Sequence, residues 1–213
     1  MRKQLTAERL VHSRRAAASG ALAVAAVLGL MSSSGLAANA PPAPAASWPA
    51  DSVHQADVAL ETSRGDQTTL AATGGHVRIV SMFYASCAAA CPLTVDTLRR
   101  IDGELTAQER ARLAILLVTF DPEHDDPAAL REFAGQHRIE DARWTLGRAS
   151  LADTRKLAGA LDIRYRELDD GNFNHSTVLV LLDPVGRVLA RTTRMGTPDP
   201  QFMAAVRKAL GGA

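Results

Sequence analysis

The chain has 213 residues, and its 24 lysines and arginines nearly balance its 23 aspartates and glutamates, giving a formal net charge of +1. Basic residues form no block beyond the first fifteen positions, so nucleic acid is excluded as an expected partner. Residues 48–213 amount to about 165 residues, the size of one ordinary domain.

The first forty residues have the pattern of an export signal. A basic, polar stretch precedes Ala16–Met31, an uncharged apolar run of sixteen residues, and small residues follow it up to Ala40. Because roughly 20 apolar residues are needed to cross a membrane, a cleaved signal peptide is expected over residues 1–40, with a retained N-terminal membrane anchor as the alternative. Residues 41–47 are expected to be a Pro/Ala-rich linker, and residues 48–213 to lie in the periplasm or at the outer face of the cytoplasmic membrane.

Two short apolar runs, Val77–Tyr84 and Leu113–Phe120, are typical of strands that are buried on both faces of a sheet. Residues 92–105 lie between them and carry apolar side chains at helical spacing, beginning with a proline suited to the first helical position. A strand–helix–strand unit of this kind predicts parallel pairing of the two strands.

The second half of the domain adds further elements with clear end signals. Two helices opened by capping residues are predicted over residues 126–137 and 150–161. An antiparallel hairpin with strands 178–182 and 188–192 is predicted around the turn Asp183–Gly186, and a last helix over residues 201–210. This order, with a cysteine pair after an early strand, predicts an α/β thioredoxin-like three-layer fold, in which helices flank a central mixed β-sheet.

The only two cysteines, Cys87 and Cys91, lie where the first strand ends and a helix begins. A helix start favours thiolate, and four-residue spacing lets both sulfurs meet as a disulfide or as two arms of a chelate. A stabilising disulfide is the less favoured interpretation, because so short a loop constrains the unfolded chain little. Two thiolates suit Cu(I), and an added imidazole would suit either copper oxidation state, or zinc with an open position.

Six histidines are candidates for that imidazole. His175 follows a turn-rich stretch and immediately precedes a predicted strand, which makes it a weak candidate ligand on these grounds alone. Asp121 and Asp126 are expected to form a turn and a helix start, although Asp121 would also follow a parallel strand near the thiols. The other histidines are expected in the signal segment (His12) or at the solvated surface (His54, His76, His124 and His137). Packing roles are expected for Met82, Met195, Trp144 and Phe173.

Four segments, in order, resemble the Sco/SenC family of copper-binding assembly factors. The segment from Phe83 to Leu93 resembles that family's Phe-x-x-x-Cys-x-x-x-Cys-Pro stretch, and Thr119–Pro127 resembles its Asp-Pro-x-x-Asp-x-Pro stretch. Trp144–Gly147 resembles its tryptophan-containing segment, and Asn174–Gly186 is similar to its His-Ser and Asp-Pro-x-Gly block.

The resemblance implies a copper site, for Cu(I) or Cu(II), made by Cys87, Cys91 and His175. It also implies an exported copper chaperone that supports assembly of the binuclear copper centre of cytochrome c oxidase. The expected partners are the oxidase subunit that holds this centre and other copper or thiol-redox proteins. The alternative is a thiol–disulfide oxidoreductase in which Cys87 and Cys91 are the catalytic pair, in oxidase maturation or in redox or copper homeostasis. A conventional enzyme is not expected.

One departure from the family pattern lies inside the cysteine loop. Ala88 stands where the family commonly has proline, and Ala90 stands where it often has an acidic residue. The change removes a rigid residue and a charge that would oppose thiolate formation. The ligand set is intact, and the difference is expected to alter the copper affinity and redox potential relative to typical members of the family.

Overall fold

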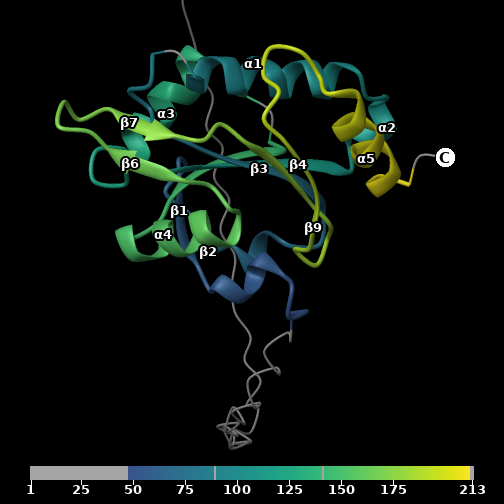
Figure 1. The fold of residues 1–213 in the computed structure, drawn as a ribbon, viewed down its shortest axis with the longest axis horizontal. Helices are drawn as coiled ribbons and strands as arrows, with labels where there is room; N and C mark the ends of the chain where they lie inside the picture. Colours follow the sequence, from purple (N-terminus) through teal and green to yellow (C-terminus); the bar gives the residue numbers. More distant parts are fainter. Residues whose placement is uncertain (1–47, 89, 141, 212–213) are drawn as a thin grey trace, which may run out of the picture. The chain divides into compact units, whose positions relative to one another are not determined.

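The computed structural model describes residues 48–88, 90–140 and 142–211 (Figure 1). The expected signal peptide or anchor over residues 1–40, and the linker over residues 41–47, lie outside the described residues. Within the described part of the chain, no helix has the length and apolar character needed to cross a membrane.

A mixed sheet of seven strands forms the centre of the domain, in the order β2-β1-β5-β4-β3-β8-β9. β3, β4 and β5 run parallel to one another, and the other neighbours pair antiparallel. The strands are β1 (Ala59–Thr62), β2 (Gln67–Thr69), β3 (Val77–Phe83), β4 (Leu113–Thr119), β5 (Trp144–Arg148), β8 (Leu179–Leu182) and β9 (Val188–Thr192). The predicted mixed sheet, with a parallel pair at its core and an antiparallel hairpin after it, is confirmed.

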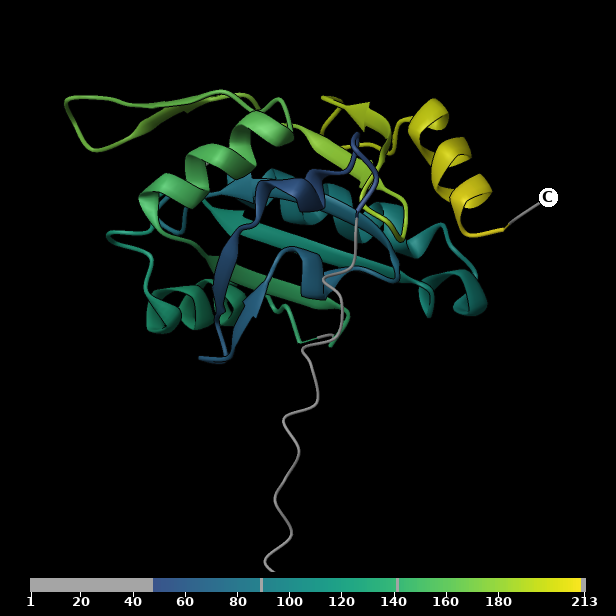
Figure 2. The ribbon, with the colours of Figure 1, turned by 90° about the horizontal axis from the view of Figure 1, so that it is seen from below.

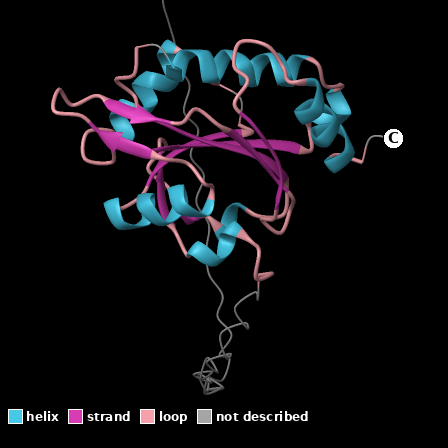
Figure 3. Cartoon of the chain, viewed as in Figure 1, coloured by secondary structure: helices cyan, strands magenta, loops and turns pink. Residues whose placement is uncertain are grey.

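Helices cover both faces of this sheet, with α1 and α3 on one side and α4 on the other (Figure 3). The α-helices are α1 (Ala90–Gly103), α2 (Ala107–Arg110), α3 (Pro127–Gln136), α4 (Leu151–Ala160) and α5 (Pro200–Ala209), and the short 3-10 helices are η1 (Val53–Ala56) and η2 (Ala71–Thr73). Asp126 and Ser150 accept hydrogen bonds from the first-turn amides of α3 and α4, as predicted.

The parallel pairing of β3 with β4 determines at which edge of the sheet the candidate site lies. Every residue of β3 is buried, and the pair is in parallel register from Val77 with Leu113 to Phe83 with Thr119. Both strands therefore end at the same edge of the sheet, so the segments that follow them, residues 84–91 and 120–126, emerge together. Trp144 and Met82 lie in the buried core, and Met195 and Phe173 are partly buried and pack against it.

A second, two-stranded sheet was not predicted, because its strands are only three residues long and largely polar. β6 (Tyr165–Glu167) and β7 (Phe173–His175) pair antiparallel, with Tyr165 opposite His175. The turn-rich stretch before His175, residues 169–174, thus forms the turn and the start of the second strand of a hairpin. This hairpin projects from the body of the domain (Figure 2). β1 and β2 were not predicted either, because their sequences lack a clear alternation of apolar and polar residues.

The prediction that His54 is a solvated surface residue is wrong. His54 lies in η1 with 5% of its surface exposed, and its ring meets the Trp48 ring at 4.5 Å. Gly186 closes the pocket around it with φ +83°, where an added Cβ would lie 2.6 Å from the Ser52 Oγ and 2.9 Å from the His54 ring. Gly186 belongs to the turn between β8 and β9, far in sequence from Ser52 and His54, so no local sequence pattern predicts these contacts.

Burial of His54 predicts a loss of stability in mild acid. Its pKa is lowered by burial first and then by the positive charge of Arg78, while Asp183 acts in the opposite direction. The unfolded chain therefore binds more protons than the folded chain as pH falls through the ordinary histidine pKa of about 6.5, and the free energy of unfolding decreases by up to about 1.4 kcal/mol per pH unit. Urea denaturation between about pH 5 and 7 measures how steeply the free energy of unfolding falls with pH. This slope should be shallower for His54→Gln than for the parent chain. The exposed His76→Gln variant should keep the parent slope, and equal slopes in all three proteins would contradict the assignment.

Candidate metal centre

The structure brings Cys87, Cys91 and His175 together. One ligand atom from each, two sulfurs and an imidazole nitrogen, lie within 4.8 Å of one another. Cys87 follows β3, Cys91 belongs to the first turn of α1, and His175 ends β7, so three separate elements meet at this point. The two thiols are 7% and 2% exposed, His175 is half-buried, and no disulfide joins the sulfurs.

The start of α1 holds the two thiols close to each other. The helix begins at Ala90 rather than at Pro92, two residues earlier than predicted, so that Cys91 lies inside the helix. The Cys91 N–H consequently donates a hydrogen bond to the Cys87 Sγ at 3.3 Å, and the Cys87 N–H donates to the Tyr84 carbonyl at 3.2 Å. A helix N-terminal amide directed at a sulfur stabilises its thiolate form.

Burial acts against thiolate formation at the second cysteine. The pKa of Cys91 is raised, mainly by burial, and further by the neighbouring Cys87 and the Asp125 carboxylate. The expectation that the helix start favours thiolate is therefore reversed at Cys91, where desolvation outweighs the helix dipole. A metal bound here must displace a proton from the Cys91 thiol.

The imidazole of His175 is prepared for ligation. Burial lowers its pKa, with a hydrogen bond to the Ser176 carbonyl acting in the opposite direction, so the ring is neutral at pH 7. Its centroid lies 4.9 Å from that of Phe120 and 6.0 Å from that of Tyr84. A neutral ring nitrogen is the form that binds metal ions.

A cluster of aromatic rings fixes the hairpin that carries His175. The Tyr165 ring stacks on Phe120 at 5.2 Å, and the Phe173 ring lies 5.1 Å from Tyr84, which follows β3. Phe173 is a packing residue, as predicted, but the cluster as a whole was not foreseen. Its members come from segments far apart in sequence, and only the resemblance of residues 174–186 to a known block pointed toward them.

Asp125, to which no role was assigned, supports the cysteine loop. Its Oδ2 accepts hydrogen bonds from the Ala85 N–H at 2.9 Å and from the Thr119 hydroxyl, and the residue is 3% exposed. Asp121, the carboxylate expected near the thiols, instead pairs with the exposed His124 at 2.8 Å. The signal available in the sequence was the position of Asp125 as the second aspartate of the Asp-Pro-x-x-Asp stretch.

Asp125→Ala is expected to destabilise the fold, because it leaves the Ala85 N–H and the Thr119 hydroxyl without their acceptor. Each orphaned buried donor costs about 1–3 kcal/mol. Asp125→Asn retains one acceptor oxygen and should recover most of the loss. Urea denaturation compares the free energies of unfolding, and equal losses in the two variants would contradict the proposed role of the carboxylate.

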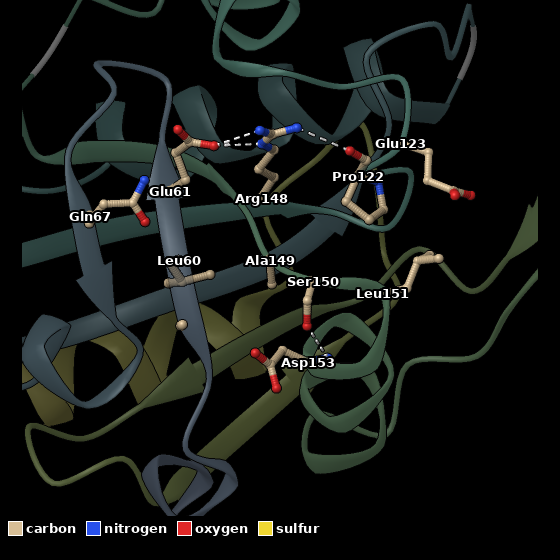
Figure 4. Close-up of a pocket in the computed structure, with 11 residues that line it drawn as sticks. Leu60, Glu61, Gln67, Pro122, Glu123, Arg148, Ala149, Ser150, Leu151 and Asp153 are labelled. Carbon is tan, nitrogen blue, oxygen red and sulfur yellow. Dashed lines mark hydrogen bonds and ion pairs between the residues drawn. The ribbon is translucent and has the colours of Figure 1, made fainter.

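The thiol and imidazole sides of the centre open into different cavities. Cys87 lines a cavity of about 540 Å³ between the cysteine loop and α3, whereas His175 lines one of about 400 Å³ against β6. A further cavity of about 370 Å³ contains none of the three residues (Figure 4). There Arg148 bridges Glu61 at 2.7 Å and the Pro122 carbonyl at 3.3 Å, which ties the loop after β4 to the sheet.

The model of the SCO1/SenC family matches residues 49–211. The chain belongs to the SCO1/SenC family. This membership confirms the predicted resemblance, and with it the thioredoxin-like fold and a family in which solved structures carry copper.

Individual relatives of this SCO1/SenC chain are distant. A putative copper-binding protein of Stutzerimonas stutzeri is 29% identical over 113 residues, which cover 53% of this chain and 55% of that protein. The match thus spans about half the length of the curated relative. A putative electron transfer protein from Aquifex aeolicus VF5 is 26% identical with a TM-score of 0.67, over 76% of this chain and 95% of that one. Arabidopsis thaliana ScoI with copper bound shares the fold, with a TM-score of 0.61 at 16% identity over 73% and 96% of the two chains.

Proposed function

We propose that this protein is an exported copper chaperone, which binds one copper ion through the sulfurs of Cys87 and Cys91 and a ring nitrogen of His175. The observation that carries the proposal is the meeting of these three atoms within 4.8 Å. Two soft sulfurs satisfy Cu(I), and the imidazole extends the set to Cu(II). Family membership, with solved members that hold copper, supports the choice of metal.

The arrangement of the ligands suits a carrier of copper. Burial raises the pKa of the Cys91 thiol and lowers that of the His175 imidazole, so these two ligands favour their neutral forms before loading. Copper binding then displaces thiol protons, and protons compete with the metal during release. Three ligands leave a coordination position through which a partner's ligand can enter, as transfer between proteins requires.

The proposed client is the subunit of cytochrome c oxidase that holds the binuclear copper centre. Support comes from the four ordered motifs that resemble the Sco/SenC family and from the export pattern of residues 1–40. The corresponding place of action is the periplasm or the outer face of the cytoplasmic membrane, where other copper or thiol-redox proteins are further partners.

A second candidate function is thiol–disulfide exchange by Cys87 and Cys91. The observation that favours it is the Cys91 N–H hydrogen bond to the Cys87 sulfur at 3.3 Å, which holds the residues near enough to form a disulfide. His175 separates the two functions. A dithiol pair has no evident use for an imidazole brought in by a separate hairpin, whereas a copper site does.

Copper titration of the reduced full-length chain tests the proposal. Cu(I) supplied in competition with a chromogenic chelator should be retained at one equivalent per chain, and Cu(II) added under the same anaerobic conditions should also be held. A chain that reduces a model disulfide in repeated turnovers but retains no copper would contradict the chaperone and favour thiol–disulfide exchange.

A further inference from the structure

The cavity on the His175 side has an unusual charge. It measures about 400 Å³ and is lined by Arg164, Tyr165, Arg166, Asn174, His175 and Ser176. This lining includes two guanidinium groups and no carboxylate. By contrast, the cavity on the Cys87 side includes Asp125 and Glu132 among its lining residues.

The two guanidinium groups do not stabilise the fold through ion pairs. Arg164 and Arg166 are both exposed, and among the described residues no carboxylate oxygen lies within 4.0 Å of either group. Some arginines of the domain do form ion pairs, such as Arg143 with Asp102 at 2.8 Å and Arg148 with Glu61 at 2.7 Å. Arg164, directly before β6, and Arg166, within it, are therefore available for an external anion.

The hairpin fixes where the two arginines lie relative to the metal centre. Alternate side chains of a strand lie on opposite faces, so Arg164 and Arg166 flank Tyr165, whose ring packs on Phe120. Tyr165 is directly opposite His175, and paired strands lie about 4.8 Å apart. Arg164 and Arg166 line the same cavity as His175, so an anion held by the arginines would be bound in the cavity beside the candidate copper ligand. Arg166 also lines the neighbouring cavity, whose lining includes the carboxylates of Asp121, Glu123 and Glu167.

We propose that Arg164 and Arg166 dock an acidic segment of the protein that exchanges copper with the Cys87–Cys91–His175 centre. This inference rests on the proposed chaperone function. Guanidinium groups bind carboxylates through paired hydrogen bonds, and a cationic face beside the site raises the rate of encounter with an acidic partner. Such a segment, bound along β6, would place the partner's metal-binding residues next to His175, at the hairpin that projects from the body of the domain (Figure 2).

Docking is tested without copper. A hexaglutamate peptide is titrated into the reduced, metal-free, ¹⁵N-labelled full-length chain at low ionic strength. Amide shift changes should concentrate at residues 164–166 and 174–176 and should disappear in the Arg164→Glu/Arg166→Glu variant. The control variant Arg100→Glu/Arg112→Glu changes charge equally at two other exposed positions and should bind the peptide as the parent does. Shift changes confined to other surfaces, or unchanged binding by the β6 variant, would overturn the proposal.

Two further variants and a copper measurement complete the test. Arg164→Gln/Arg166→Gln removes the charge without reversing it and should bind the peptide at an intermediate level, which separates lost docking from a distorted hairpin. On the Cu(I)-loaded chain, extraction by the anionic chelator bathocuproine disulfonate should slow about tenfold in the glutamate variant at low salt. Extraction by neutral 2,9-dimethyl-1,10-phenanthroline should not change, and equal slowing of both chelators would contradict a role of this face in exchange. A parent chain that binds no Cu(I) would refute the proposed function, while the peptide titration would still decide the docking surface.

Discussion

Serine in place of Cys87 or Cys91 should lower the affinity for Cu(I) by more than the roughly 100-fold that loss of a supporting residue around a metal typically costs. Each change replaces a soft sulfur by a hydroxyl oxygen of similar shape, which is a poor ligand for Cu(I) and is not ionised at pH 7. Because both thiols are buried in the core, the exchange tests the ligand atom rather than the accessibility of the site. The measurement is competition for Cu(I) against a chelator of known affinity.

The matched control for the cysteine variants is Ser86→Ala. Ser86 is exposed and lies next to Cys87 in the same turn, so this variant alters the loop without altering the ligand set. Its Cu(I) affinity should equal that of the parent chain. Cysteine variants that retain affinity within tenfold of the parent would contradict the assignment of both sulfurs as ligands.

His175→Ala should weaken Cu(II) retention by at least about 100-fold while leaving Cu(I) partly bound, because two thiolates satisfy Cu(I) without an imidazole. The capacity of Cys87 and Cys91 to form a disulfide should persist, since neither sulfur depends on the ring. Cu(II) retention is followed by the thiolate-to-copper absorption band, and disulfide formation by thiol titration after oxidation.

His124→Ala is the control for the histidine variant. His124 lines the cavity on the Cys87 side but lies outside the group of three candidate ligands. Its removal should leave Cu(II) retention unchanged. If His175→Ala and His124→Ala behaved alike, the imidazole of His175 would not be a ligand, and the two cysteines alone would account for copper binding.

The central part of the fold follows from local patterns in the sequence. β3 and β4 are continuous apolar runs because both of their faces are covered by helices, and such runs can be recognised without tertiary information. The helix starts at Asp126 and Ser150 follow from capping, which is also local. With the strand and the helix placed, the cysteine pair falls at their junction and identifies the active end of the sheet.

The remainder of the site depends on contacts between distant segments. His175 reaches the thiols because the rings of Tyr165 and Phe173 pack on Phe120 and Tyr84, and three-residue strands carry no periodic signal that would predict this. Family resemblance supplied what local pattern could not. The raised pKa of Cys91 likewise follows from burial, which depends on the assembled fold.

X-ray absorption spectroscopy at the copper edge of the loaded full-length chain is the most direct test of the three-ligand centre. For Cu(II) the spectrum should contain two sulfur neighbours and one imidazole, and the imidazole contribution should disappear in His175→Ala. Copper surrounded only by oxygen and nitrogen, or an imidazole contribution that persists in His175→Ala, would contradict the centre described for Cys87, Cys91 and His175.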